Sequence, residues 1–208
     1  MVHTSAIPLG SEWIDIRRLD AAAVNNHLRV ATLGPQLTSS EIAARYLIAL
    51  LEEKYGLRGE VTIYTSFDDA SEAVMDCSAS AILVANAYSG INNYYMDARL
   101  ALGAVFIHPT PPYGLAGLPQ VEPSQPWRIA VHPACLPLLN EMVPKTQCFE
   151  QIFASSTSAA AQMVLDKEAH LALTNAEAAR KLGLHFISHT RPIQMLWSLF
   201  VQLRPRIT

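Results

Sequence analysis

Short apolar runs alternate with amphipathic stretches along most of the chain. Residues 28–33 form a brief apolar run that Gly34-Pro35 ends, which predicts a buried strand. Apolar positions then recur at three- and four-residue spacing as far as Gly56, which predicts a helix that begins at a hydroxyl side chain within 38–40. The same order continues, with strands predicted at 61–64, 81–85, 103–107, 127–131, 148–154, 170–173, 184–187 and 196–201, and helices at 66–75, 91–102, 134–142, 157–166 and 175–182.

The alternation of strands and helices predicts an α/β fold with right-handed crossovers. Two such series follow one another, so we expect two lobes, each a mainly parallel sheet flanked by helices. Crossings near 105–115 and 186–196 would connect them, and a ligand cleft is expected between the lobes. The predicted boundaries are an N-terminal arm over 1–27, a first lobe over 28–106 plus 190–208, and a second lobe over 107–189.

Composition and charge argue against several classes of protein. The chain has 208 residues, 50% of them hydrophobic, and a net charge of -3, so it can bury a core and lacks the basic surface of a nucleic-acid or membrane-surface binder. No apolar run reaches the roughly 18 residues of a membrane span. The N-terminus shows no secretory signal pattern, and Cys77, Cys135 and Cys148 show no metal-like spacing. We therefore expect a cytoplasmic protein with reduced thiols.

Two hydroxyl-rich turns, Thr38-Ser39-Ser40 and Ser155-Ser156-Thr157, stand where strands lead into predicted helices. Such a turn offers free backbone N–H groups and short hydroxyls, which together form an anion site. Capping alone explains one such turn. Two of them, one in each predicted lobe, favour a ligand with two carboxylates. The chain has no phosphate-loop or G-x-G-x-x-G motif and no metal-like histidine spacing, so no cofactor and no metal are expected.

Other polar residues also follow predicted strands. His132 and His108 each precede a proline near the expected cleft and titrate near neutral pH, although a structural histidine explains each equally well. The stretch Asn86–Ser89 carries polar groups out of the strand at 81–85, whereas residues 94–96 are predicted to be helix core. Cys135 has no base beside it in sequence, which disfavours a nucleophilic cysteine.

These motifs resemble those of the prephenate dehydratase family. The stretch from Leu33 to Glu41 is similar to the opening G-P-x-G-T-[FS]-S motif, and 81–90 is similar to the strand with the P-I-E-N-S segment. Residues 131–134 resemble S-H-P-Q-A, and 155–161 resemble S-T-x-x-A-A. The resemblance covers about 28–200 and implies a two-lobed periplasmic-binding-protein-like (type II) fold, with no C-terminal regulatory domain expected in this chain.

Departures from that pattern point to one branch of the family. Gln36-Leu37 replaces the x-Gly step, Val84–Tyr88 lacks the glutamate of P-I-E-N-S, and Met195-Leu196-Trp197 stands at T-R-F, whose threonine helps expel the ring hydroxyl. Thr190-Arg191 precedes the last strand and is interpreted as a coincidence. The chain resembles the prephenate decarboxylases of bacilysin/anticapsin and aeruginosin biosynthesis. This implies a cofactor-independent lyase in antibiotic or other secondary metabolite biosynthesis.

The resemblance implies non-aromatizing decarboxylation of prephenate to a dihydro-4-hydroxyphenylpyruvate. A dehydratase that gives phenylpyruvate and a non-catalytic solute-binding module on the same fold are the alternatives. The proton donor is predicted to be His132, with water or Tyr113 behind it, and the 155–157 turn is predicted to hold the pyruvyl carboxylate. No nucleic-acid or membrane partner is expected, and a homodimer is left open. The predicted substrate-binding residues are Thr38, Ser39, Ser40, Asn86, Tyr88, Ser89, Ser155, Ser156, Thr157 and Met195.

Overall fold

The computed structural model describes residues 12–119 and 125–203, so residues 1–11 of the predicted N-terminal arm lie outside the described residues. Contacts between residues divide the chain into two compact units, each with its own sheet. Within the described chain, unit 1 contains 12–33, 43–108 and 194–203, and unit 2 contains 34–42, 109–119 and 125–193. The 34–42 turn thus groups with unit 2, whereas the sequence placed it in the first lobe.

Unit 1 is built on a six-stranded sheet in the order β1-β5-β11-β4-β2-β3. Strand β2 pairs in parallel with both β3 and β4, which forms the predicted parallel core. Strand β11 runs antiparallel to β4, and β1 runs antiparallel to β5, so the sheet is mixed beyond that core. The bounds are β1 Glu12–Ile14, β2 His27–Leu33, β3 Arg58–Tyr64, β4 Ala81–Ala85, β5 Leu100–Pro109 and β11 Gln194–Gln202.

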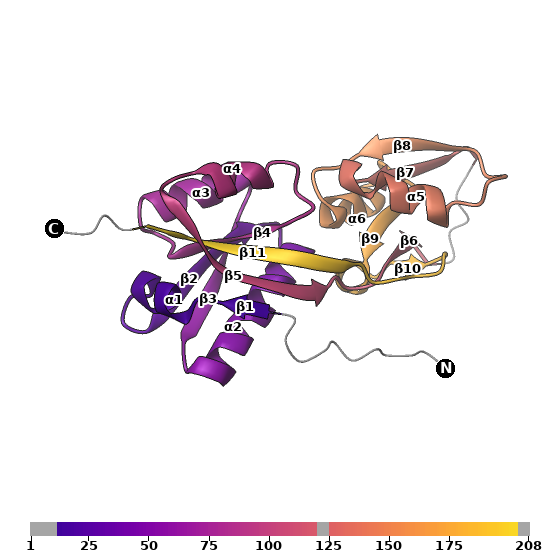
Figure 1. Cartoon of the computed structure of the whole chain (residues 1–208). Coiled ribbons are helices and arrows are strands. Elements are labelled where there is room, and N and C mark those ends of the chain that lie inside the picture. The colour runs from indigo at the N-terminus through magenta and orange to yellow at the C-terminus, as the bar shows by residue number, and fades with distance from the viewer. Residues whose placement is uncertain (1–11, 120–124, 204–208) are drawn as a thin grey trace. The chain divides into compact units, whose positions relative to one another are not determined.

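Helices cover both faces of this sheet (Figure 1). Helices α1 (Ile16–Ala22) and α2 (Ser39–Tyr55) bury residues in the same apolar cluster as Trp197 of β11. Helices α3 (Phe67–Met75) and α4 (Ile91–Met96) bury residues in the cluster of Phe200. Successive side chains of a strand point to opposite faces, so β11 supplies both clusters in turn.

Unit 2 is built on a five-stranded sheet in the order β10-β6-β9-β7-β8. Strand β7 pairs in parallel with β8 and β9, whereas β6 runs antiparallel to β9 and to β10. Helices α6 and α7 pack on one apolar cluster and α5 on another. The bounds are β6 Tyr113–Gly117, β7 Trp127–Val131, η1 Pro133–Cys135, α5 Leu136–Met142, β8 Phe149–Phe153, α6 Thr157–Leu165, β9 Leu171–Asn175, α7 Ala176–Lys181 and β10 His185–Phe186.

Most predicted elements are confirmed to within a few residues, but three regions differ. The predicted helix over 91–102 is wrong in its second half, because α4 ends at Met96 and β5 begins at Leu100. The Asp97 carboxylate accepts from the Arg99 backbone N–H at 2.9 Å, and such a local turn competes with helix. Strand β6 went unpredicted inside the Pro-rich crossing, as did β1 and α1 in the arm. Among the described residues, no helix has the length and apolar character that crossing a membrane requires.

Candidate functional site

Unit 2 brings three predicted site hydroxyls together. The Ser39 Oγ and Tyr113 Oη atoms lie 2.8 Å apart, and the Thr157 side chain is near enough to the Tyr113 phenol to lower its pKa. Ser39 begins α2, Tyr113 begins β6 and Thr157 begins α6, so three separate elements contribute one group each. We call Ser39, Tyr113 and Thr157 the hydroxyl cluster.

Burial sets the chemistry of the hydroxyl cluster. Tyr113 is only 6% exposed, and burial raises the pKa of its phenol above the ordinary 10.0, against the opposing effect of the Ser39 and Thr157 side chains. The phenol therefore stays protonated at neutral pH and is a hydrogen-bond donor. Burial also raises the pKa of the Cys135 thiol to about 11, so this cysteine is not an activated nucleophile.

The remaining hydroxyls of the two turns act mainly as helix caps or lie apart. Ser156 Oγ accepts from the Ala159 backbone N–H at 2.9 Å, and Thr38 Oγ1 accepts from the Glu41 backbone N–H at 3.3 Å. These bonds satisfy N–H groups that a helix start leaves open. Ser155 is exposed and Ser40 is buried. The turns therefore contribute one hydroxyl each to the cluster, namely Ser39 and Thr157.

Asn175, which the sequence did not single out, supports the turn that carries Ser39. Its Nδ2 donates to the Leu37 carbonyl at 2.9 Å, and its Oδ1 accepts from the Ala178 backbone N–H at 2.9 Å. Asn175 is fully buried and stands opposite Tyr113 in the pairing of β6 with β9. A sequence signal was available, because an asparagine that follows an apolar strand and precedes a helix is a preferred N-cap.

Leu37 holds an unusual backbone conformation in the same turn. Its φ of 69° lies in the left-handed region, which costs a non-glycine residue about 1–2 kcal/mol. Its carbonyl is held by Asn175, and its N–H donates to the Glu41 carboxylate at 2.6 Å. Strained backbone persists where surrounding bonds fix it, and it concentrates at functional sites.

His132 follows β7 as the N-cap of η1. Its Nδ1 accepts from the Ala134 backbone N–H at 3.3 Å, so in this arrangement the ring proton sits on Nε2. Burial lowers the pKa of the imidazole below its ordinary 6.5, which favours the neutral ring at pH 7. Within the described part of the chain, its side chain makes no hydrogen bond to the hydroxyl cluster.

In unit 1, Asn86 forms hydrogen bonds with two residues that the sequence did not single out as site residues. Ser198 Oγ donates to Asn86 Oδ1 at 2.8 Å, Asn86 Nδ2 donates to Tyr95 Oη at 3.2 Å, and Tyr95 Oη lies 2.8 Å from Ser198 Oγ. We call these three residues the amide ring. The prediction of helix core is confirmed for the buried Tyr94 and is wrong for Tyr95, which is 43% exposed, and for Met96, which is also exposed.

The other predicted residues of unit 1 lie apart from the amide ring. The Tyr88 ring packs on Phe67 with centroids 4.4 Å apart, and Ser89 is exposed. Met195 packs against the Trp197 cluster, whereas Ser198 lies on the opposite face of β11, because strand residues alternate between faces. The predicted cleft between the lobes stays a prediction.

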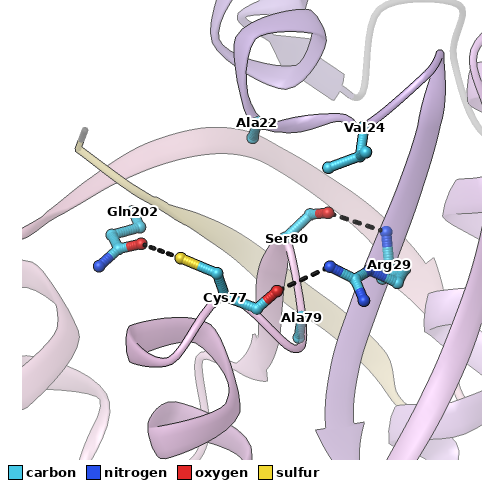
Figure 2. A pocket seen from close by; sticks show the side chains of 7 residues that line it. All are labelled: Ala22, Val24, Arg29, Cys77, Ala79, Ser80 and Gln202. Carbon is cyan, nitrogen blue, oxygen red and sulfur yellow. Dashed lines mark hydrogen bonds between the residues drawn. The ribbon is translucent and has the colours of Figure 1, made fainter.

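A small hollow in unit 1 is lined by none of the predicted site residues (Figure 2). It lies where β2 and β4 begin, whereas Asn86 follows the end of β4. Arg29 donates to the Cys77 carbonyl at 2.7 Å, and Cys77 Sγ donates to Gln202 at 3.5 Å, so its polar groups largely satisfy one another. All three cysteines are free, and no group of three or more His, Cys, Asp or Glu among the described residues is suited to hold a metal. The hollow is lined by Ala22, Val24, Arg29, Cys77, Ala79, Ser80 and Gln202.

Comparison with known proteins gives close matches in sequence. No family model matches the chain. Prephenate decarboxylase of Bacillus subtilis is 34% identical over 184 residues, which covers 86% of this chain and 89% of that protein. Prephenate decarboxylase of Planktothrix agardhii (strain NIVA-CYA 126/8) is 38% identical over 180 residues, which covers 83% of this chain and 87% of that protein.

Solved structures confirm the predicted fold class. A prephenate dehydratase from Arthrobacter aurescens in complex with L-Phe superposes with a TM-score of 0.63 at 21% identity over 85% of this chain, and the match spans 61% of that longer protein. A periplasmic substrate-binding protein of an ABC transporter from Coxiella burnetii superposes with a TM-score of 0.53 at 16% identity, covering 84% of both chains. The chain therefore has a periplasmic-binding-protein-like α/β fold with two sheets.

Proposed function

The chain belongs to the prephenate decarboxylase family, and we propose that it is a carboxy-lyase that removes CO2 from prephenate without aromatizing the ring. The observation that carries this proposal is 34–38% identity to prephenate decarboxylases over nearly their whole length. The hydroxyl cluster of unit 2 adds neutral donors suited to a dicarboxylate substrate.

The reaction sets clear demands on the protein. The bond between the ring carbon and its carboxylate breaks, CO2 leaves, and the electron pair enters the diene. A proton then adds to another ring carbon, and the hydroxyl stays in place. The protein must hold the pyruvyl carboxylate, supply one proton to carbon, and offer no acid to the ring hydroxyl.

Tyr113 is better suited than His132 to supply that proton. The Tyr113 phenol is protonated at neutral pH, and the Ser39 and Thr157 hydroxyls beside it would stabilise the phenolate that proton transfer leaves, against the effect of burial. The lowered pKa of His132 leaves little imidazolium at neutral pH, and its Nδ1 is already engaged with Ala134. We therefore propose Tyr113 as the proton donor, which reverses the order that the sequence suggested.

Ser39 and Thr157 are proposed to bind substrate oxygens as neutral donors. A neutral donor suits the leaving carboxylate, because a cation there would stabilise the ground state more than the transition state, in which charge has moved into the ring. Thr157 also begins α6, whose first backbone N–H groups favour an anion, so it is the proposed anchor of the pyruvyl carboxylate.

Proton NMR of the product tests this function. Purified protein is incubated with prephenate in buffer that contains a chelator, and a parallel sample without protein measures spontaneous decay. We expect a product that keeps the carbinol proton and vinylic ring signals. Aromatic phenylpyruvate above the background would instead establish a dehydratase. Tight prephenate binding with no turnover would establish a solute-binding module.

A further inference from the structure

The amide ring of unit 1 is a closed set of hydrogen bonds between three elements. Asn86 directly follows β4, Ser198 lies in β11, and Tyr95 lies in α4. The Asn86 backbone is fixed as well, because its N–H donates to the Leu196 carbonyl at 2.9 Å. Its side-chain amide therefore has little freedom to turn.

Counting hydrogens fixes the direction of every bond in the amide ring. Ser198 has one hydroxyl hydrogen, and it goes to Asn86 Oδ1. The 2.8 Å contact between Tyr95 and Ser198 must then have the Tyr95 phenol as donor. Asn86 Nδ2 gives one of its two hydrogens to Tyr95 Oη. Both hydroxyl hydrogens are used, and Asn86 keeps one N–H without a partner in the ring.

The exposure of the three residues indicates which side of the amide ring is open to a ligand. Ser198 is fully buried, whereas Tyr95 is 43% exposed and Asn86 is half-buried. The Tyr95 ring is held edge-on against Phe200, with centroids 5.0 Å apart. The ring of bonds is therefore closed at its buried side by Ser198 and open at the side of Asn86 and Tyr95.

We propose that Tyr95 and Ser198 are positioning residues that hold the Asn86 amide so that its remaining N–H donates to a substrate oxygen. This inference rests on the proposed function, because prephenate supplies the acceptor oxygen. An amide carries no titratable proton, so Asn86 binds that oxygen without offering the acid that hydroxide departure needs. Tyr95 and Ser198 act through Asn86 and not on the substrate.

A double-mutant cycle tests the positioning role. We expect Tyr95→Phe to raise the KM for prephenate about threefold to tenfold and to leave kcat nearly unchanged, as for one misplaced neutral hydrogen bond. Asn86→Ala should raise KM at least as much. In the Asn86→Ala background, Tyr95→Phe should then have no further effect on KM, because the amide that Tyr95 positions is gone.

Control variants and measurements distinguish a loss of Asn86 positioning from a loss of folding stability and from a failure of the proposed function. Tyr55→Phe, at the exposed end of α2, removes a matched phenol away from the amide ring and should leave KM unchanged. Ser198→Ala should raise KM like Tyr95→Phe, and its urea midpoint shows whether the fold survives. An unchanged KM in Tyr95→Phe, or an equal increase in both backgrounds, would overturn the positioning role. A parent protein without turnover would overturn the proposed function itself.

Discussion

Two tyrosines, Tyr113 in unit 2 and Tyr95 in unit 1, each contact a serine hydroxyl at 2.8 Å. The direction of the hydrogen bond is fixed for Tyr95 and is not fixed for Tyr113. The Tyr95 phenol must donate its proton to Ser198, because the one hydroxyl hydrogen of Ser198 is already donated to Asn86. Among the described residues, no comparable bond fixes the hydroxyl hydrogen of Ser39, so either oxygen of the Tyr113–Ser39 pair can be the donor. A matched distance therefore does not imply a matched role, since the next partner in the network decides which phenol can give a proton away.

Burial widens the difference between the two tyrosines. Tyr113 is 6% exposed and Tyr95 is 43% exposed. In a dry environment a hydrogen bond is electrostatically stronger, and an unpaired group costs more. Loss of the Tyr113 hydroxyl should therefore matter to the chemistry, whereas loss of the Tyr95 hydroxyl should matter to the placement of a neighbour.

The largest effect is expected from Tyr113→Phe. Removing the proposed donor should lower kcat about 100-fold, in the ordinary range for general acid catalysis. Tyr95→Phe is the matched control, because it removes the same hydroxyl and should change KM instead of kcat. Initial rates of prephenate consumption separate the two parameters. Equal loss of kcat in both variants would remove the distinction between the tyrosines.

A smaller effect is expected at the serines of the two hydroxyl-rich turns. Ser39→Ala removes a hydroxyl of the cluster and should weaken prephenate binding about tenfold, as for a hydrogen bond to a charged group. Ser156→Ala removes the N-cap of α6 and should lower the free energy of unfolding by about 1 kcal/mol. Calorimetry and urea unfolding measure the two quantities. If Ser39→Ala binds as tightly as the parent, Ser39 is structural.

The smallest effect on catalysis is expected at His132. Because burial lowers its pKa, the folded state favours the neutral ring, and the unfolded chain takes up the proton first as the pH falls below about 6.5. Its contribution to stability is therefore present above that pH and is lost below it. His132→Gln should lose less stability than the parent between about pH 7 and pH 5, with kcat changed less than threefold.

Urea midpoints at the two pH values and a pH profile of kcat check this prediction. With Tyr113 as donor, kcat should stay flat across the neutral range, because the phenol pKa lies above 10.0. A kcat that rises as the pH falls through the range of His132, and that collapses in His132→Gln, would restore the histidine as the proton donor.

Sequence patterns predicted much of the fold because apolar runs and glycine stops are local signals. The run at 28–33 and the ends at Gly56 and Gly183 match β2, α2 and α7, and both glycines hold positive φ values near 67°. Strand β6 was missed because prolines precede it and its five residues are all buried, so no alternation marks it.

The candidate site was less accessible from sequence. Hydroxyls at 38–40 and 155–157 stood out, but which of them reach Tyr113 depends on pairing between residues far apart in the chain. Asn175 contacts Leu37 across 138 positions, and no local pattern encodes that bond. Tyr95 was assigned to helix core because an aromatic beside Tyr94 looks the same in sequence whether it points inward or outward.

The bond between Asn175 and Leu37 also has a consequence for how the protein is made. During synthesis the 34–42 turn leaves the ribosome long before the strand that carries Asn175. Until that strand emerges, the carbonyl of Leu37, whose backbone is strained, lacks its hydrogen bond from Asn175. The turn that carries Ser39 therefore lacks this fixing partner until Asn175, which lies 138 positions after Leu37, has been translated. A nascent chain stalled shortly before β9 would thus carry β2, β3 and β4 without β11, the sheet neighbour of β4, and would lack the bond that fixes the Ser39 turn.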